Sequence, residues 1–313
     1  MPLDSPEQHP RKPHPFTIVG GVEFFRWRVS VGGLLGLHPR LRDRGGHFEF
    51  LLRPGHNVLE FLDESFCVSK LELAEGQRLL ILMYHHIAVP PANVRLRGLY
   101  TTPRQFDGQL RWLKKQPLAF TTFGQLIKGA QSSCSRLVML TFDDGLHDNY
   151  TEALPILRRH DIPAVVYPVM NELGCRGVVW PEAKDQTPAD LIDEKEIREM
   201  RLGGIEFGSH LLEHTHLTTH SADEQKRQLV ESRDALQKIL AEDVLSVAYP
   251  YGDVDDAVAG RALEAGYRFG MTTLEGTNTR DANPMLLKRI PAKGSKIYHP
   301  LKFRREVRRQ LGL

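Results

Sequence analysis

The chain has 313 residues, of which 41% are hydrophobic and 26% are charged, and its formal net charge at pH 7 is +2. This composition is typical of a globular protein that buries a sizeable core, as one large domain or two smaller ones. It argues against a largely disordered chain, and so small a net charge gives no reason to expect a nucleic-acid partner.

The N-terminal segment and the cysteines indicate where in the cell the protein is expected and whether disulfides or a zinc knuckle are expected. Residues 1–15 are rich in proline and charge, lack the apolar core of a secretory signal, and predict a disordered leader. No apolar run approaches the ~20 residues of a membrane span, so we expect a cytoplasmic protein. The cysteines form no Cys-x-x-Cys pair, which argues against a zinc knuckle or a disulfide framework; they are Cys67, Cys134 and Cys175.

Residues 16–78 form an N-terminal extension whose role the sequence does not indicate. Aromatic and β-branched residues alternate there with glycines, a pattern that predicts short strands. From Leu79 onward the pattern changes to longer apolar runs separated by amphipathic stretches, so we assign residues 79–313 to the main domain.

The main domain alternates expected strands and helices. Buried strands are predicted at 79–84, 136–142, 163–170, 204–208, 245–250 and 267–273. Amphipathic helices are predicted at 102–116, 149–160, 193–201, 221–241 and 254–265. This alternation indicates an α/β domain with a parallel sheet or barrel, in which the chemistry gathers at the carboxyl ends of the strands.

The expected strand 136–142 ends in two adjacent carboxylates, Asp143 and Asp144, followed by Gly145. Neighbouring side chains on a strand point in different directions, and two like charges in a half-buried place repel unless a cation lies nearby. One interpretation is an ordinary turn, since Asp and Gly are turn residues. The other is a metal site.

Three histidines follow the expected strand 204–208. His210 and His214 are four residues apart, so a helical turn would project both imidazoles from one face, as two ligands of one metal ion require. A lone pair at this spacing is more often solvated. His216 is a third candidate, but two residues beyond His214 its side chain should point away from the face that His210 and His214 share.

A carboxylate from another strand end would complete a set of three ligands. Asp144 can supply it, which leaves Asp143 free to act as a base. A divalent cation would also favour the ionised forms of both carboxylates.

Together with the later segment Ala248-Tyr249-Pro250-Tyr251-Gly252, these motifs resemble in their order the polysaccharide deacetylases with a NodB homology domain, carbohydrate esterase family 4. The resemblance runs from Leu79 to the C-terminus. It implies a distorted (β/α) barrel that removes N-acetyl groups from an amino sugar or glycan with a divalent metal, zinc being the expected ion. It further implies Asp143 as general base, the backbone N–H of Tyr251 as oxyanion donor, and a metal-ligand set of Asp144, His210 and His214.

Two positions depart from the family pattern. Ala248 stands where the family has an arginine that orients the base, and Arg289 is a candidate replacement. The usual late motif with the general-acid histidine is missing, and only His299 remains near the C-terminus. The branch of poly-N-acetylglucosamine deacetylases carries this histidine upstream in a Tyr-His motif, which is Tyr84-His85 here. We therefore predict His85 as the general acid; a histidine that merely closes the strand is the other interpretation.

The C-terminal segment predicts an amphipathic helix, because Phe303, Val307 and Leu311 recur every four residues among basic residues. Packing against the domain through this apolar face is the first interpretation. Peripheral contact with an anionic membrane surface or a phosphate-bearing substrate is the second.

The absence of a recognisable signal favours a nucleotide- or lipid-linked amino sugar as substrate over a cell-wall polymer. Two alternatives stay open: a metal hydrolase that cleaves a non-sugar amide or an ester on the same fold, and a carbohydrate-binding relative without turnover.

Overall fold

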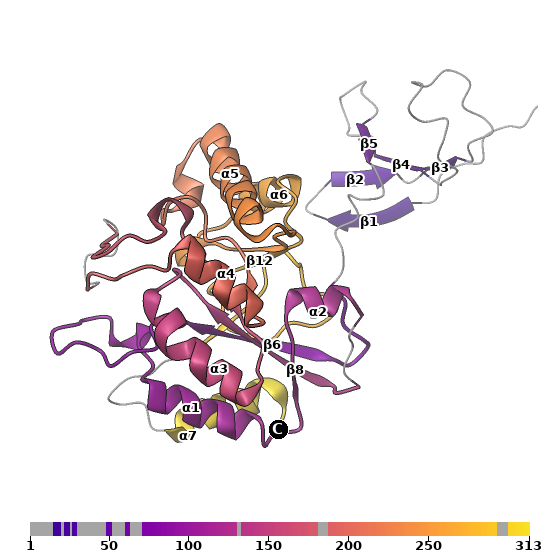
Figure 1. The fold of residues 1–313 in the computed structure, drawn as a ribbon. Coiled ribbons are helices and arrows are strands. Elements are labelled where there is room, and N and C mark those ends of the chain that lie inside the picture. The colour runs from indigo at the N-terminus through magenta and orange to yellow at the C-terminus, as the bar shows by residue number, and fades with distance from the viewer. Residues whose placement is uncertain are drawn as a thin grey trace, which may run out of the picture. The chain divides into compact units, whose positions relative to one another are not determined.

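The computed structural model describes residues 71–129, 133–180, 187–292 and 300–313, together with the backbone of five N-terminal strands. The chain divides into two compact units, Met1–Val68 and Ser69–Leu313 (Figure 1). The N-terminal unit contains short antiparallel strands, as expected: β1 (Pro15–Val19) pairs with β2 (Val22–Phe25), and β4 (Phe48–Leu51) lies between β3 (Trp27–Val29) and β5 (Glu60–Leu62). The expected leader covers residues 1–15; residues 1–14 lie outside the described residues, and Pro15 begins β1.

The C-terminal unit is built on parallel strands. One sheet has the order β10-β9-β8-β6-β13, in which β7 pairs with the beginning of β8. Its strands are β6 (Arg78–Tyr84), β7 (Ala119–Phe120), β8 (Arg136–Phe142), β9 (Val165–Val166), β10 (Glu206–Phe207) and β13 (Ile290–Pro291). A second parallel pair consists of β11 (Ser246–Ala248) and β12 (Phe269–Met271).

Two single parallel bridges close these strands into a ring. Ser209, just beyond β10, pairs with Val247 in β11, and Met271 in β12 pairs with Leu287, just before β13. Because β13 pairs in turn with β6, the ring is complete. The result is a distorted (β/α) barrel, so the expected fold class is confirmed.

Helices surround the barrel (Figure 1). The five helices predicted between the strands are present as α1 (Pro103–Leu113), α3 (Leu154–His160), α4 (Glu194–Leu202), α5 (Ala222–Leu240) and α6 (Asp256–Glu264). A π-helical turn over Asn149–Ala153 precedes α3. Pro155 therefore lies in the first turn of α3, where a missing N–H is harmless. The sequence analysis did not predict α2 (Phe123–Ile127), which begins at the capping box of Thr122 and Gln125.

Successive side chains of β6 and β8 point alternately to two different hydrophobic clusters. Even-numbered residues such as Leu82 and Leu140 pack against the surrounding helices. Odd-numbered residues such as Ile81 and Met139 join the barrel interior, where they meet side chains of β9, β11 and β12. The same parity directs His85 and Asp143, which follow these two strands, toward the interior side of the barrel rim.

The C-terminal helix α7 (Pro300–Leu311) packs through its apolar face. Phe303, Val307 and Leu311 are all buried, and the Phe303 ring meets the edge of Trp112 at a centroid distance of 6.0 Å. The first interpretation of this segment is therefore confirmed, and a membrane contact would depend on its charged face alone. Among the described residues, no helix combines the length and apolar character needed to cross a bilayer.

We predict that the C-terminal unit folds without the N-terminal extension, and that residues 69–77 contribute to its stability. Leu71 and Leu73 are 1% and 5% exposed, and burying a leucine contributes ~1.5–3 kcal/mol. A chain beginning at Arg78 should therefore fold and keep some activity, but unfold at a lower temperature than one beginning at Ser69. Thermal unfolding of the two purified chains measures the difference; insolubility of both would show that the extension belongs to the core.

Candidate active site

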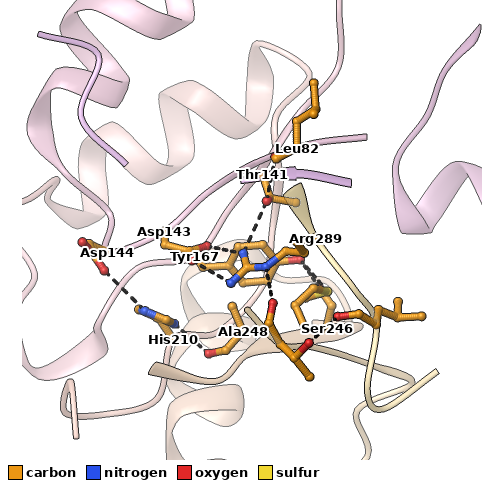
Figure 2. A network of polar contacts seen from close by, with 12 residues as sticks. Leu82, Thr141, Asp143, Asp144, Tyr167, His210, Ser246, Ala248 and Arg289 are labelled. Atoms are coloured by element: carbon orange, nitrogen blue, oxygen red, sulfur yellow. Dashed lines mark hydrogen bonds and ion pairs between the residues drawn. The ribbon is translucent and has the colours of Figure 1, made fainter. Parts of the chain in front are cut away.

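The two adjacent aspartates face different partners. Asp143 is 3% exposed, and its backbone N–H continues the ladder by donating to the Tyr84 carbonyl at 3.0 Å. Its carboxylate meets Arg289, whereas Asp144 turns away toward His210 (Figure 2). The backbone of Asp144 makes this divergence possible, because its φ of +74° reverses the chain directly after the strand.

Asp143 forms a bidentate ion pair with Arg289. Nη1 lies 2.7 Å from Oδ1 and Nη2 lies 2.8 Å from Oδ2, while Arg289 Nε donates to the Thr272 carbonyl at 2.9 Å. The guanidinium is 0% exposed, so the pair is strong but expensive to desolvate. Burial opposes ionisation of Asp143, yet Arg289 and the nearby histidines outweigh it and hold the pKa of this carboxyl below its ordinary value.

The second aspartate completes a compact cluster. Ligand atoms of Asp144, His210 and His214 lie within 4.8 Å of one another, and all three side chains are buried. The Nε2 atoms of His210 and His214 lie 3.4 and 3.5 Å from Asp144 Oδ1. Three donors from two strand ends thus converge on one point, as the sequence analysis expected.

Each histidine of the cluster is held through its other ring nitrogen. His210 Nδ1 donates to the Ala248 carbonyl at 2.7 Å, and His214 Nδ1 bonds the Tyr251 hydroxyl at 3.0 Å. Such contacts fix ring orientation and leave Nε2 available for a metal. Asp144 Oδ1 is buried and has no hydrogen-bond partner among the described residues, which is costly unless a cation faces it. The donor set therefore fits a divalent metal ion.

The loops that carry the cluster contain strained backbone. Asp144, Leu211 and Tyr251 have φ values of +74°, +69° and +59°, a region that non-glycine residues avoid. Each lies in one of the three motifs recognised in the sequence. Gly145 is required as well, since a Cβ there would meet Pro168 Cα at 2.7 Å. Of the five non-glycine residues with positive φ in the described part of the chain, these three lie at the site, and Asp161 and Ala241 end helices.

The other histidines separate into distinct environments. His85 is within electrostatic reach of Asp143 and Asp144: burial lowers the pKa of its ring, and the two carboxylates partly offset that effect. His86 bonds Asp148 at 2.6 Å and stacks on Tyr100, away from the cluster. His216 stacks on the Tyr251 ring, so it supports the site from outside, whereas His299 lies outside the described residues.

Comparison with known proteins shows what the chain is similar to. The polysaccharide deacetylase family matches residues 130–270. The chain is 24% identical over 273 residues to the poly-β-1,6-N-acetyl-D-glucosamine N-deacetylase of Staphylococcus aureus, covering 79% of this chain and 89% of that one. The chain therefore carries a polysaccharide deacetylase domain.

Solved structures agree with this assignment. The Streptococcus pyogenes deacetylase PplD, in complex with acetate, superimposes with a TM-score of 0.61 at 26% identity, covering 75% of this chain and 98% of PplD. IcaB from Ammonifex degensii shares the fold with a TM-score of 0.62 at 19% identity, covering 76% of this chain and 98% of IcaB. As a polysaccharide deacetylase, the chain is a hydrolase of a family that uses a divalent metal. His85 and Arg289 lie outside the range that the family matches.

Two residues of this deacetylase's site were missed from the sequence. The buried Trp180 ring lies 4.5 Å from the His214 ring, centroid to centroid, and its indole N–H donates to Glu172 at 2.6 Å. Burial raises the pKa of the Glu172 carboxyl. Both residues come from the segment between β9 and α4, where no motif or periodicity indicates proximity to the histidines. Only the folded chain brings them there.

We predict strong energetic coupling between Asp143 and Arg289. Arg289→Met should lower the free energy of unfolding by about 3–5 kcal/mol, because it leaves a buried carboxylate without its cation. Adding Asp143→Asn should recover part of this loss, since the uncompensated charge is then gone. Denaturant unfolding of the two single variants and the double variant measures the coupling.

A surface pair provides the matched control. Arg198 contacts Glu194 with both side chains more than half exposed, so Arg198→Met should change stability by no more than about 0.5 kcal/mol. Simple additivity of the Asp143 and Arg289 variants would contradict the coupling.

Proposed function

We propose that this protein removes N-acetyl groups from N-acetylglucosamine residues of a glycan by hydrolysis, with zinc held by Asp144, His210 and His214. The observation that carries the proposal is the buried cluster of these three ligands beside an ionised aspartate that is not one of them. A binding protein would not need a paired carboxylate next to a metal-ligand set, which argues against a relative without turnover. Two imidazoles and one carboxylate suit zinc.

Amide hydrolysis needs help at three points, because an amide is a poor electrophile with a poor leaving group. A divalent cation in this cluster supplies Lewis-acid polarisation of the substrate carbonyl and makes nearby water more acidic. The protein's own side chains and backbone must then accept a proton from water, stabilise the developing oxyanion and protonate the departing amine.

Asp143 is the proposed general base. Its pKa is held low, so the carboxylate is ready to accept a proton at neutral pH. Both oxygens bond Arg289, which fixes the carboxylate plane beside the cluster. Arg289 thereby takes the part of the arginine that is missing at Ala248, from a different strand end.

His85 and Tyr251 are the proposed proton donor and oxyanion donor. His85 reaches the same rim by the parity of β6, and its electrostatic contact with both aspartates supports a place at the reacting group. Tyr251 belongs to the strained turn after β11, and its hydroxyl already bonds His214. A backbone N–H in such a turn is preorganised for a developing negative charge.

The glycan is proposed from the relatives, because the Staphylococcus aureus protein is named for poly-β-1,6-N-acetyl-D-glucosamine and PplD was captured with acetate. The nucleotide- or lipid-linked amino sugar expected from the sequence is the second substrate to be tried in the acetate-release test below. Cytoplasmic location stays a prediction, which cell fractionation tests.

Acetate release coupled to metal analysis tests the function. The metal-loaded enzyme should release acetate from an oligomer of β-1,6-linked N-acetylglucosamine and should lose this activity on chelation. A faster rate on small non-sugar amides would favour the broader hydrolase interpretation. A loaded protein that releases no acetate from any acetylated sugar would contradict the proposal.

We predict that the two aspartates have separable roles. Asp144→Ala, His210→Ala or His214→Ala should lose the metal, because each removes one of three protein ligands. Asp143→Asn should retain the metal and lose turnover, since it removes the base alone. Metal content and acetate release are measured on each variant. A metal-free Asp143→Asn beside a fully loaded Asp144→Asn would reverse the two assignments.

We predict that His85→Ala lowers turnover on the amide by roughly 10²–10⁴-fold with unchanged metal content, because the leaving amine then lacks its proton donor. The defect should shrink on an aryl acetate, whose leaving group needs no proton. His86→Ala is the neighbouring control and should affect turnover far less. Near-wild-type amide hydrolysis by His85→Ala, with collapse in His299→Ala, would move the acid to the C-terminal side.

A further inference from the structure

A pocket of about 220 Å³ lies between α1 and α7, two helices that run side by side in Figure 1. Its lining shares no residue with the candidate active site. The lining residues used below are Arg104, Gly108, Gln109, Trp112, Phe303 and Arg304.

The walls of the pocket are apolar, and Gly108 leaves the space between them unfilled. Trp112 and Phe303 meet edge to face at the α1–α7 contact. A Cβ on Gly108 would meet no atom within 4 Å, and its backbone is ordinary helix, so no steric demand requires glycine there. Glycine inside a helix costs about 1 kcal/mol relative to alanine. The missing side chain at this position is what leaves the space open.

Gln109 also belongs to the lining of this pocket, but its amide is buried. Gln109 is 6% exposed, and its Oε1 accepts a hydrogen bond from the Tyr84 hydroxyl at 2.9 Å. Its Nε2 has no hydrogen-bond partner among the residues that the structure describes. This nitrogen is enclosed by protein atoms, so it offers no contact to a ligand in the pocket.

Two guanidinium groups line the same pocket. Neither Arg104 nor Arg304 has an ion-pair partner in the described part of the chain, in contrast to Arg111, which pairs with Asp107. The Arg304 guanidinium lies 5.9 Å from the centre of the Trp112 ring, so positive charge sits directly against the apolar wall. A ligand here must carry both an anion and an apolar part.

We propose that the α1–α7 pocket binds a small amphipathic anion. Its phosphate or carboxylate oxygens accept hydrogen bonds from Arg104 and Arg304. Its apolar chain packs on Trp112 and Phe303 in the space above Gly108. A free amphiphile and an anionic lipid share this chemistry, and this second site is independent of the deacetylase reaction.

Isothermal titration of the full-length protein with octyl phosphate, below its micelle concentration, tests the site. Octyl phosphate should bind at least about tenfold more tightly than inorganic phosphate or octanol, because only octyl phosphate uses both the cations and the apolar walls. Gly108→Leu should fill the space and weaken binding at least about tenfold. Gly260→Leu is the matched control, because this α6 glycine has equally open surroundings and should leave binding unchanged.

A charge variant gives a second, independent comparison. Arg304→Gln should weaken octyl phosphate binding by roughly tenfold, as expected for loss of one charge-assisted hydrogen bond. Arg305→Gln removes an exposed charge from the same helix outside the pocket and should retain binding. Because Arg304 is on the surface, this pair keeps the test decisive if Gly108→Leu fails to fold.

Vesicles of phosphatidylglycerol separate the two sources of the ligand. Vesicle binding that Gly108→Leu abolishes would identify the ligand as a lipid, and octyl phosphate binding without vesicle binding would identify it as a free amphiphile. The proposal is overturned if Gly108→Leu binds octyl phosphate as the wild type does, or if inorganic phosphate binds equally well. The proposal is also overturned if wild type and Gly108→Leu bind vesicles equally and neither binds octyl phosphate. The vesicle binding would then come from surface charge and not from the pocket.

Discussion

The buried ion pair between Asp143 and Arg289 is the interaction on which the arrangement of the site depends. Two charges removed from water are tolerated only with near-ideal geometry and further hydrogen bonds, and both are present: two parallel contacts of 2.7 and 2.8 Å and the Thr272 carbonyl on Arg289 Nε. The pair therefore admits little displacement of either partner. It holds Asp143 in the barrel interior and leaves Asp144, the next residue, to serve the metal-ligand cluster.

Closure of the barrel explains how this pair can form. Arg289 and Asp143 are 146 residues apart in the chain. The parallel pairing of β13 with β6, and of β6 with β8, carries the last strand of the barrel back to the first. Catalytic groups can therefore be drawn from either end of the sequence and still meet on one rim. The family match ends at residue 270, whereas Arg289, beyond it, contacts the proposed base.

The strained turns at Asp144, Leu211 and Tyr251 require support from their surroundings, since each non-glycine residue with positive φ costs of order 1–3 kcal/mol. That support comes from close packing. Gly145 lies against Pro168, and a Cβ on Gly252 would meet the Thr273 backbone nitrogen at 2.8 Å. The hydrogen bonds to the Nδ1 atoms of His210 and His214 add to this support. The geometry of the candidate ligand cluster is thus set by the protein.

The sequence alone determined the strand–helix alternation, the three motifs at strand ends and the residues of the candidate metal-ligand cluster, because period and motif spacing are local properties. Parity along β6 and β8 likewise directed His85 and Asp143 to one interior. Only the tertiary structure decided that Arg289 meets Asp143, that the Tyr251 hydroxyl holds His214 and that Trp180 covers the His214 ring. These contacts join segments far apart in the chain, and their geometry follows from closing the barrel and packing the loops above it, which no local pattern encodes.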